Sequence, residues 1–199
     1  MKIKKMLSYE ESLKILKETN ALVDGHFILS SGLHSPKYVQ CAQLLSKPYL
    51  AEKICLSLSQ KIANEFNEID LILSPAMGGI IIGYEIGKLL KTNTIFSERV
   101  NGKFSLRRNF EINKGNKVLI IEDVITTGKS ILECEELVKK YQGLTIGFAC
   151  IIDRSNNNFK TEKKIVSQVK LDIPTFKPDN LPKDLSQIKP IKPGSRDLK

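Results

Sequence analysis

The chain has 199 residues, of which 41% are hydrophobic and 27% are charged, and this composition is typical of a soluble globular domain. It excludes a coiled coil, a collagen-like fibre and a wholly disordered chain. Lys and Arg outnumber Asp and Glu by 31 to 22, a formal net charge of +9. Such an excess favours nucleic acid, a membrane surface or a phosphorylated small molecule as partner. Two segments account for the excess of positive charge: residues 98–117, with six basic and two acidic residues, and residues 160–199, with ten basic and five acidic residues.

The sequence contains no sign of secretion or of a membrane span. Residues 1–14 lack the apolar core of a signal peptide. The longest apolar stretch, residues 79–90, is interrupted by Glu85 and Lys88 and is far shorter than the roughly 20 residues that cross a bilayer. The chain has no CxxC pair, and its cysteines are Cys41, Cys55, Cys134 and Cys150. We therefore expect a cytoplasmic protein with reduced thiols that pack in or near the core.

Helical patterns dominate the first third of the chain. A helix is predicted over about residues 9–20, because Ser8 and Glu11 form a capping box and apolar residues then recur at helical spacing. A turn-rich segment with short extended pieces follows over residues 24–41. A second amphipathic helix is predicted over residues 48–64, where apolar residues lie four apart.

From residue 70 onward, short apolar runs alternate with helical patterns. The predicted strands are residues 71–74, 94–97, 118–123 and 144–153, and the predicted helices are about residues 79–91 and 128–141. Buried strands separated by helices predict an α/β fold with a central, mostly parallel sheet flanked by helices. The last 25 or so residues contain five of the eight prolines, which indicates a tail that is packed on the surface or partly mobile.

The most informative segment is residues 118–130, VLIIEDVITTGKS. Its apolar strand ends in Glu122 and Asp123, and a turn rich in Thr and Gly then opens a helix. Ligands of open α/β sheets bind at this edge, and a helix amino terminus offers N–H groups and a positive dipole to a phosphate. Adjacent carboxylates suit ribose hydroxyls or a magnesium shell. The segment therefore predicts a ligand with a phosphate at one end and hydroxyls or Mg²⁺ beside it.

Two other interpretations of this segment were weighed. Its ending, GKS, is also the ending of a P-loop, but a P-loop needs Gly where this chain has Asp123, and a carboxylate would repel the phosphate. The remaining alternative is a strand-to-helix turn whose acidic residues are incidental.

The segment resembles the phosphoribosyl pyrophosphate (PRPP) signature of the type I phosphoribosyltransferase family. Further segments resemble the orotate-specific branch of this family, and in chain order they are residues 24–41, 70–87, 96–112, 151–155 and 190–196. The resemblance implies the type I phosphoribosyltransferase fold, with residues 1–199 as a single domain. Its core would span about residues 46–170, and a small hood would combine residues 20–45 with the carboxyl-terminal tail. Residues 96–112 would form a mobile hairpin loop.

The resemblance also implies an activity. The family branch transfers the 5-phosphoribosyl group from PRPP to orotate, giving orotidine 5′-phosphate and pyrophosphate in de novo pyrimidine (UMP) biosynthesis. It implies Mg²⁺ as cofactor, bound through PRPP and water with no direct protein ligand. The implied assembly is a homodimer in which each loop reaches the neighbour's site. Neither nucleic acid nor a membrane is then expected as partner.

Roles for individual residues follow from the same resemblance. Glu122 and Asp123 would bind the ribose hydroxyls, directly or through the Mg²⁺ shell. The phosphate cradle would comprise Val124, Ile125, Thr126, Thr127, Gly128, Lys129 and Ser130. The pyrophosphate loop would comprise Pro75, Ala76, Met77, Gly78 and Gly79.

The base and the leaving group have their own predicted contacts. Thr126 would lie near orotate, and Arg154 would pair with the orotate carboxylate through a planar, bidentate contact. Arg99 and Lys103 would contact PRPP and act with Asp123 as catalytic residues, because departing pyrophosphate needs cations. A solvated basic hairpin is the alternative interpretation of this loop.

Some residues depart from the family pattern. Ser30 and Gly78 stand where many members have Lys, and residues 181–184 read LPKD where the related bacterial branch has a Cys pair. His34 is expected either to touch substrate or to lie in a surface turn. Two rival functions stay open: a phosphoribosyltransferase for a purine or another base, and a PRPP-sensing regulator that binds nucleic acid. Arg154 argues against the first, and the scarcity of aromatic residues in the basic tail against the second.

Overall fold

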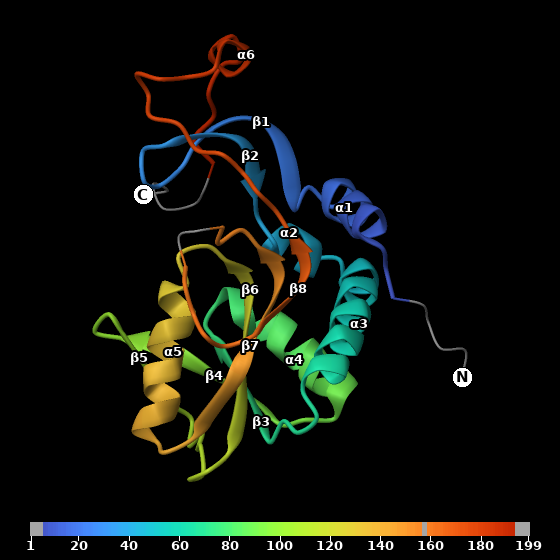
Figure 1. Cartoon of the computed structure of the whole chain (residues 1–199), viewed down its shortest axis with the longest axis vertical. Coiled ribbons are helices and arrows are strands. Elements are labelled where there is room, and N and C mark those ends of the chain that lie inside the picture. The colour runs from blue at the N-terminus through green and yellow to red at the C-terminus, as the bar shows by residue number, and fades with distance from the viewer. Residues whose placement is uncertain (1–5, 157–158, 194–199) are drawn as a thin grey trace.

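The computed structural model describes residues 6–156 and 159–193 (Figure 1). The helices are α1 (Tyr9–Glu18), α2 (Ala42–Leu45), α3 (Pro48–Glu65), α4 (Gly78–Leu90), α5 (Lys129–Lys140) and α6 (Lys183–Ser186). The strands are β1 (Leu22–Ile28), β2 (His34–Val39), β3 (Leu71–Pro75), β4 (Thr94–Val100), β5 (Lys103–Ser105), β6 (Lys117–Ile125), β7 (Leu144–Asp153) and β8 (Ile165–Lys170).

The central sheet has the strand order β5-β4-β3-β6-β7-β8, and every neighbouring pair is parallel except β4 with β5. Successive side chains of a strand point to opposite faces. In β6, Leu119 and Ile121 therefore join the hydrophobic cluster under α3 and α4, whereas Val118 and Ile120 join the cluster under α5. Helices thus cover both faces of the sheet (Figure 1), as predicted for an α/β fold.

Helix α4 packs unusually close to the sheet because of its small residues. A Cβ atom at Gly83 would lie 2.1 Å from Oγ of Ser74, so a larger residue would push the helix away from β3. This close packing places the amino terminus of α4 directly after the carboxyl end of β3.

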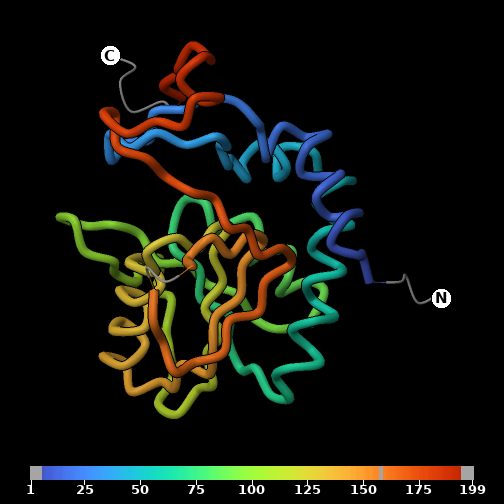
Figure 2. Tube along the Cα trace, turned by 45° about the horizontal axis from the view of Figure 1, so that its top comes forward, coloured from blue at the N-terminus to red at the C-terminus, as the bar shows by residue number. Residues whose placement is uncertain are grey.

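The hood combines the β1–β2 hairpin with the tail after β8 (Figure 2). Isolated bridges join Phe27 to Ile191 and His34 to Phe176. Nδ1 of His26 lies 2.7 Å from the carbonyl oxygen of Ile188, and Nε2 of His26 lies 2.6 Å from Nδ1 of His34. The prediction of a surface turn at His34 is therefore wrong: the residue is 9% exposed, lies on β2 and contacts His26.

The predicted helices and strands are confirmed, with differences at the functional edge, in the tail and at the short helix α2, which was not predicted. β6 runs two residues beyond the predicted 118–123, because Val124 and Ile125 still pair with β7. β8 and the short α6 were not predicted. Residues 190–196 resemble a segment of the orotate-specific branch, and the last three of them lie outside the described ranges.

All four cysteines are buried, free thiols, as expected of reduced packing residues. None of the helices in the described ranges is both long and apolar enough to cross a membrane.

Candidate active site

Three loops meet where β3, β6 and β7 end, because these strands are parallel neighbours. They are the β3–α4 loop with the predicted pyrophosphate residues, the β6–α5 loop with the PRPP signature, and the segment after β7 with Arg154. The carboxyl edge of the sheet therefore brings together three segments that are far apart in the sequence, as expected of a ligand site in this class of fold.

Glu122 and Asp123 point to opposite faces of β6. Glu122 lies on the α5 side, where the Ser130 hydroxyl hydrogen-bonds its carboxylate. Asp123 lies on the α4 side, where a Cβ atom at Gly78 would be 2.7 Å from its Oδ1 atom. The two carboxylates therefore lie on opposite sides of the end of the strand and do not converge on one point.

Burial favours the protonated form of both carboxyl groups. Burial, and next the negative charge of Asp123, raise the pKa of Glu122 to about 7, although the Ser130 hydrogen bond and the positive charge of Arg99 lower it. Burial also raises the pKa of Asp123 above its usual range, against a hydrogen bond from the backbone N–H of Val124. Two buried carboxylates of this kind are suited to accept hydroxyl protons or to face a cation.

The PRPP signature divides into a strand part and a loop part. Val124 and Ile125 were predicted to belong to the phosphate cradle, but they lie on β6, where the Val124 N–H donates to Asp123 Oδ1 and the Ile125 carbonyl accepts from the Arg154 N–H. The loop part runs through the exposed Thr126 and Thr127 to Gly128, after which Lys129 and Ser130 form the first turn of α5.

The start of α5 is open to an anion. Gly128 is its N-cap with φ 71°, and no side chain in the described part of the chain caps the helix. The first N–H groups of a helix lack internal partners, so they can bind a phosphate. A Cβ atom at Gly128 would lie 2.4 Å from Cδ2 of Phe159, which packs beneath the loop. Sequence reasoning missed Phe159, which lies far from the motif and has no local signal.

The predicted pyrophosphate loop connects β3 to α4. Pro75 ends β3, the Ala76 N–H donates to the Ser97 carbonyl oxygen at 2.8 Å, and the Ala76–Met77 peptide is cis. Met77 and Gly78 are exposed, whereas Gly79 is buried. Gly78 departs from the family pattern for a visible reason: any side chain there would require the Asp123 carboxylate to move.

The backbone of Arg154 is held by a hydrogen bond, and its side chain has no partner among the described residues. Its N–H donates to the Ile125 carbonyl oxygen at 2.9 Å, and the following turn is held by the Ser155 N–H, which donates to Asp153 Oδ1 at 2.9 Å. Burial lowers the pKa of the Arg154 guanidinium. Within residues 6–156 and 159–193, this guanidinium has no hydrogen bond and no ion pair. A half-buried cation without an acidic partner is suited to an anionic ligand.

The basic loop forms the β4–β5 hairpin, which turns at Asn101 and Gly102 with φ values of 50° and 79°. Two positive φ values in a two-residue turn match the twist of the flanking strands. Arg99 contacts α5, where its Nη1 atom lies 2.7 Å from Oε2 of Glu133. Lys103 is exposed, and its side chain has no hydrogen bond or ion pair among the described residues.

Sequence reasoning also missed Glu133, although a signal was present. Glu133 follows Lys129 by four residues and therefore lies on the same face of α5 as the start of the helix. The segment after the hairpin contains Arg107 and Arg108, and Arg108 makes two hydrogen bonds to Glu98, at 3.0 and 3.1 Å.

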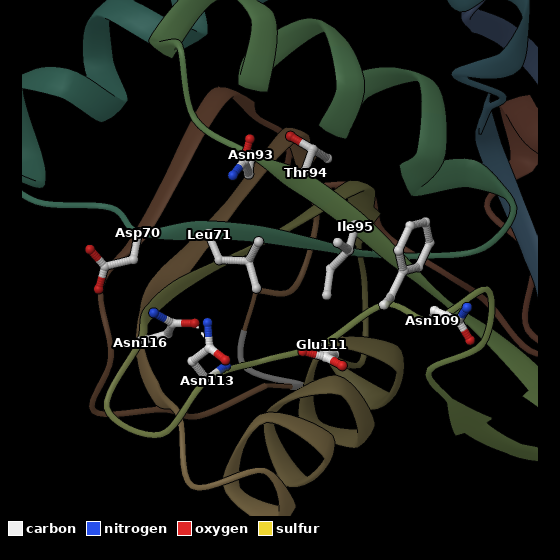
Figure 3. A pocket seen from close by; sticks show the side chains of 10 residues that line it. Asp70, Leu71, Asn93, Thr94, Ile95, Asn109, Glu111, Asn113 and Asn116 are labelled. Atoms are coloured by element: carbon white, nitrogen blue, oxygen red, sulfur yellow. Dashed lines mark hydrogen bonds between the residues drawn. The ribbon is translucent and has the colours of Figure 1, made fainter.

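A cavity of about 520 Å³ lies away from the three loops at the carboxyl edge, near the amino-terminal ends of β3 and β4 (Figure 3). Its polar lining comprises Asp70, Asn93, Asn109, Glu111, Asn113 and Asn116. None of the predicted site residues lines it. We therefore assign the substrate site to the carboxyl edge, on the chemistry of the groups that meet there.

Comparison with known proteins identifies the family of the chain. Residues 42–177 match the family model of the phosphoribosyl transferase domain. The chain is 46% identical over 190 residues to an orotate phosphoribosyltransferase of Methylorubrum populi, covering 95% of this chain and 97% of that protein. It is 44% identical over 184 residues to an orotate phosphoribosyltransferase of Caldicellulosiruptor bescii, covering 92% and 96%. UMP synthase of Leishmania donovani has a similar fold, with a TM-score of 0.69 and 21% identity over 83% of this chain and 37% of that chain. The chain therefore belongs to the phosphoribosyltransferase family.

Proposed function

We propose that this protein is an orotate phosphoribosyltransferase, which transfers the 5-phosphoribosyl group of PRPP to orotate and releases pyrophosphate in de novo pyrimidine biosynthesis. The relatives that share 44–46% identity with nearly the whole chain support this proposal. The structural observation that carries it is Arg154, a half-buried cation beside the PRPP signature whose guanidinium has no partner in the described residues. Orotate has a carboxylate that can fill this place, whereas a purine base does not.

The proposed reaction uses the two faces of β6. The start of α5 would bind the 5′-phosphate, and the pyrophosphate would lie over the exposed backbone of Met77 and Gly78. The bond between C1 of the ribose and the pyrophosphate oxygen breaks, and its electrons leave with pyrophosphate. A ring N–H of orotate gives up its proton, which solvent or the departing pyrophosphate can take, and this nitrogen forms the new bond to C1. Glu122 and Asp123 would hold the ribose hydroxyls on its two sides, and Arg99 and Lys103 would stabilise the leaving charge.

The site residues fit Mg²⁺ held mainly through its substrate. Mg²⁺ prefers oxygen ligands and usually combines one or two carboxylates with water and substrate phosphates. Glu122 and Asp123 supply such oxygens, and a cation would favour their ionised forms against the burial that raises their pKa values. When bound, Mg²⁺ would neutralise charge on the departing pyrophosphate.

Exposed apolar side chains support a homodimer. Met77 is 83% exposed, and Ile81 and Tyr84 on α4 are 54% and 67% exposed. These large apolar residues lie beside the pyrophosphate loop, where a second subunit would shield them from water.

The test is turnover with defined bases. The purified protein is mixed with PRPP and Mg²⁺, and loss of orotate absorbance and release of pyrophosphate are followed, with adenine, hypoxanthine and uracil as comparison bases. We expect turnover with orotate. Turnover with a purine but not with orotate would show that the protein is a phosphoribosyltransferase for another base. PRPP binding without turnover of any base would favour the alternative of a PRPP-sensing regulator.

Substitution of Arg154 tests the base contact directly. Loss of a charge-assisted, bidentate pair costs about 1.5–3 kcal/mol, so Arg154→Leu should raise the KM for orotate roughly 10- to 150-fold and leave the KM for PRPP nearly unchanged. Arg154→Lys keeps the charge without the planar fork and should lie between the wild type and the Leu variant. Equal changes in both KM values would contradict this role.

A further inference from the structure

Phe159 lies in the connection between β7 and β8, and its ring packs against the loop that leads into α5. A Cβ atom at Gly128 would lie 2.4 Å from Cδ2 and 2.6 Å from both Cε2 and Cγ of this ring. A Cβ atom is only about 1.5 Å from its Cα atom, so the ring contacts the Gly128 backbone itself. Phe159 is 8% exposed, and the contact is therefore shielded from water.

Gly128 is the residue at which the loop becomes a helix. It has φ 71° and ψ 1°, and its carbonyl oxygen accepts from the Leu132 N–H at 2.9 Å. The start of a helix is commonly held by a side chain that bonds the first turn, but none does so at α5 within residues 6–156 and 159–193. The Phe159 ring thus takes the place of a cap: it fixes the Gly128 backbone, and with it the direction of the first free N–H groups of the helix.

The ring is itself held in place by apolar neighbours. Its centroid lies 6.2 Å from that of Phe148 on β7, with the two planes tilted by 60°. The same buried cluster contains Ile125, the last residue of β6, and Ile131 in α5. A phenyl ring is rigid and has no hydrogen-bonding group, so it can support the loop without competing for the N–H groups that would bind a phosphate.

Arg154 lies in the same connection but is held by other contacts. Its N–H donates to the Ile125 carbonyl oxygen at 2.9 Å. Two residues later, the Asn156 side-chain amide donates to Oδ1 of Asp172 at 2.7 Å. Neither contact involves the Phe159 ring. Loss of the ring should therefore displace the phosphate loop and leave the backbone of Arg154 in place.

We propose that Phe159 is a positioning residue for the phosphoribosyl half of the substrate: its ring holds Gly128 in the left-handed conformation that directs the first N–H groups of α5 at the 5′-phosphate. This assignment rests on the proposed function. The ring acts on ligands that carry the 5′-phosphate. It does not act on pyrophosphate, which would lie over Met77 and Gly78, or on orotate, which would contact Arg154.

Binding of two partial ligands tests this division without turnover. The affinities of ribose 5-phosphate and of pyrophosphate, each with Mg²⁺, are measured by calorimetry for the wild type, Phe159→Leu and Phe159→Met. Both substitutions keep an apolar side chain and remove the rigid ring. The Kd for ribose 5-phosphate should rise roughly 10-fold, the loss expected when one N–H group no longer reaches a charged phosphate. The Kd for pyrophosphate should stay within about twofold.

Phe66→Leu is the matched control. The Phe66 ring also packs against a glycine, because a Cβ atom at Gly147 would lie 2.4 Å from Cζ of Phe66. Gly147 lies in the first half of β7, away from the carboxyl edge where the phosphate loop begins. Phe66→Leu should lower the unfolding temperature, as Phe159→Leu does, but it should leave the Kd for ribose 5-phosphate unchanged.

The same pattern is expected in turnover. Phe159→Leu should raise the KM for PRPP roughly 10-fold and leave the KM for orotate within about twofold. Gly128→Ala should raise the KM for PRPP by a smaller factor in the Phe159→Leu chain than in the wild type, because both substitutions change the position of the same backbone.

Three results would overturn the positioning role. They are unchanged ribose 5-phosphate binding in both Phe159 variants, equal weakening of ribose 5-phosphate and pyrophosphate, and equal weakening in Phe66→Leu. The last two would show a general loss of folded structure. A wild type that binds ribose 5-phosphate but does not turn over orotate with PRPP would instead refute the proposed function, and the comparison of Kd values would still decide the role of Phe159.

Discussion

The substitution Glu122→Gln tests how much folding stability the protein loses by burying the Glu122 carboxylate. This cost is separate from the proposed role of the carboxylate in ligand binding. Burial, and next the charge of Asp123, raise the pKa of Glu122 from an ordinary 4.5 to about 7. The unfolded chain exposes the same group to water, where its pKa is ordinary. Glutamine has nearly the same shape, can still accept a hydrogen bond from the Ser130 hydroxyl, and has no charge to bury.

The expected stability difference depends on pH in a defined direction. Between pH 4.5 and about 7 the unfolded chain has an ionised Glu122 while the folded protein keeps it protonated, so the folded state binds more protons and loses stability as the pH rises. Below pH 4.5 the group is protonated in both states, and the variant has no advantage. Above pH 7 the advantage of Gln reaches its maximum. At about 1.4 kcal/mol per pH unit, the upper limit is about 3 kcal/mol.

The assay is thermal unfolding of both proteins at pH 5 and pH 8. For a chain of this size 1 kcal/mol corresponds to about 2–4 °C, so Glu122→Gln should unfold up to roughly 6–12 °C higher at pH 8 and nearly with the wild type at pH 5. Added PRPP and Mg²⁺ should stabilise the wild type more than the variant, because the variant lacks the carboxylate proposed to bind them. An equal difference at both pH values, or none at pH 8, would refute the electrostatic explanation.

Three further predictions concern packing around the site. Gly128→Ala should cost about 1–2 kcal/mol in urea unfolding and raise the KM for PRPP, because φ is +71° and the new Cβ would meet the Phe159 ring; an unchanged midpoint would contradict this. The buried thiols should not react with a thiol reagent until the protein unfolds, since burial raises the pKa values of Cys41, Cys55, Cys134 and Cys150; rapid labelling of the native protein would count against it. His26→Phe removes the hydrogen bond to the Ile188 carbonyl, at about 1–3 kcal/mol for a buried group left unpaired. Amide exchange at Ile191 should then accelerate about tenfold or more while exchange in β6 stays the same, and equal acceleration in both would argue against a local anchor.

Local patterns in the sequence determined the fold class and the position of the candidate active site. The alternation of apolar runs and helical spacing predicted strands and helices close to their observed bounds, because burial on both sheet faces leaves a pattern that is readable within each element. The acid pair followed by a Thr- and Gly-rich turn identified the carboxyl edge of β6, since a strand, a turn and a helix start are consecutive in the chain. β8 was missed because its short run mixes buried and polar residues.

Only the tertiary structure decided how the cations and acids of the site are paired. It placed Arg99 beside Glu133, put Asp123 against Gly78 and left the Arg154 guanidinium unpaired among the described residues. These relations join segments that are separated by tens of residues, and no local spacing encodes them. The net charge of +9 illustrates the difference: the sequence located four units of the excess in residues 98–117. Which of those cations are neutralised inside the protein, and which stay available for a polyanionic substrate, depends on the partners that the fold brings within reach.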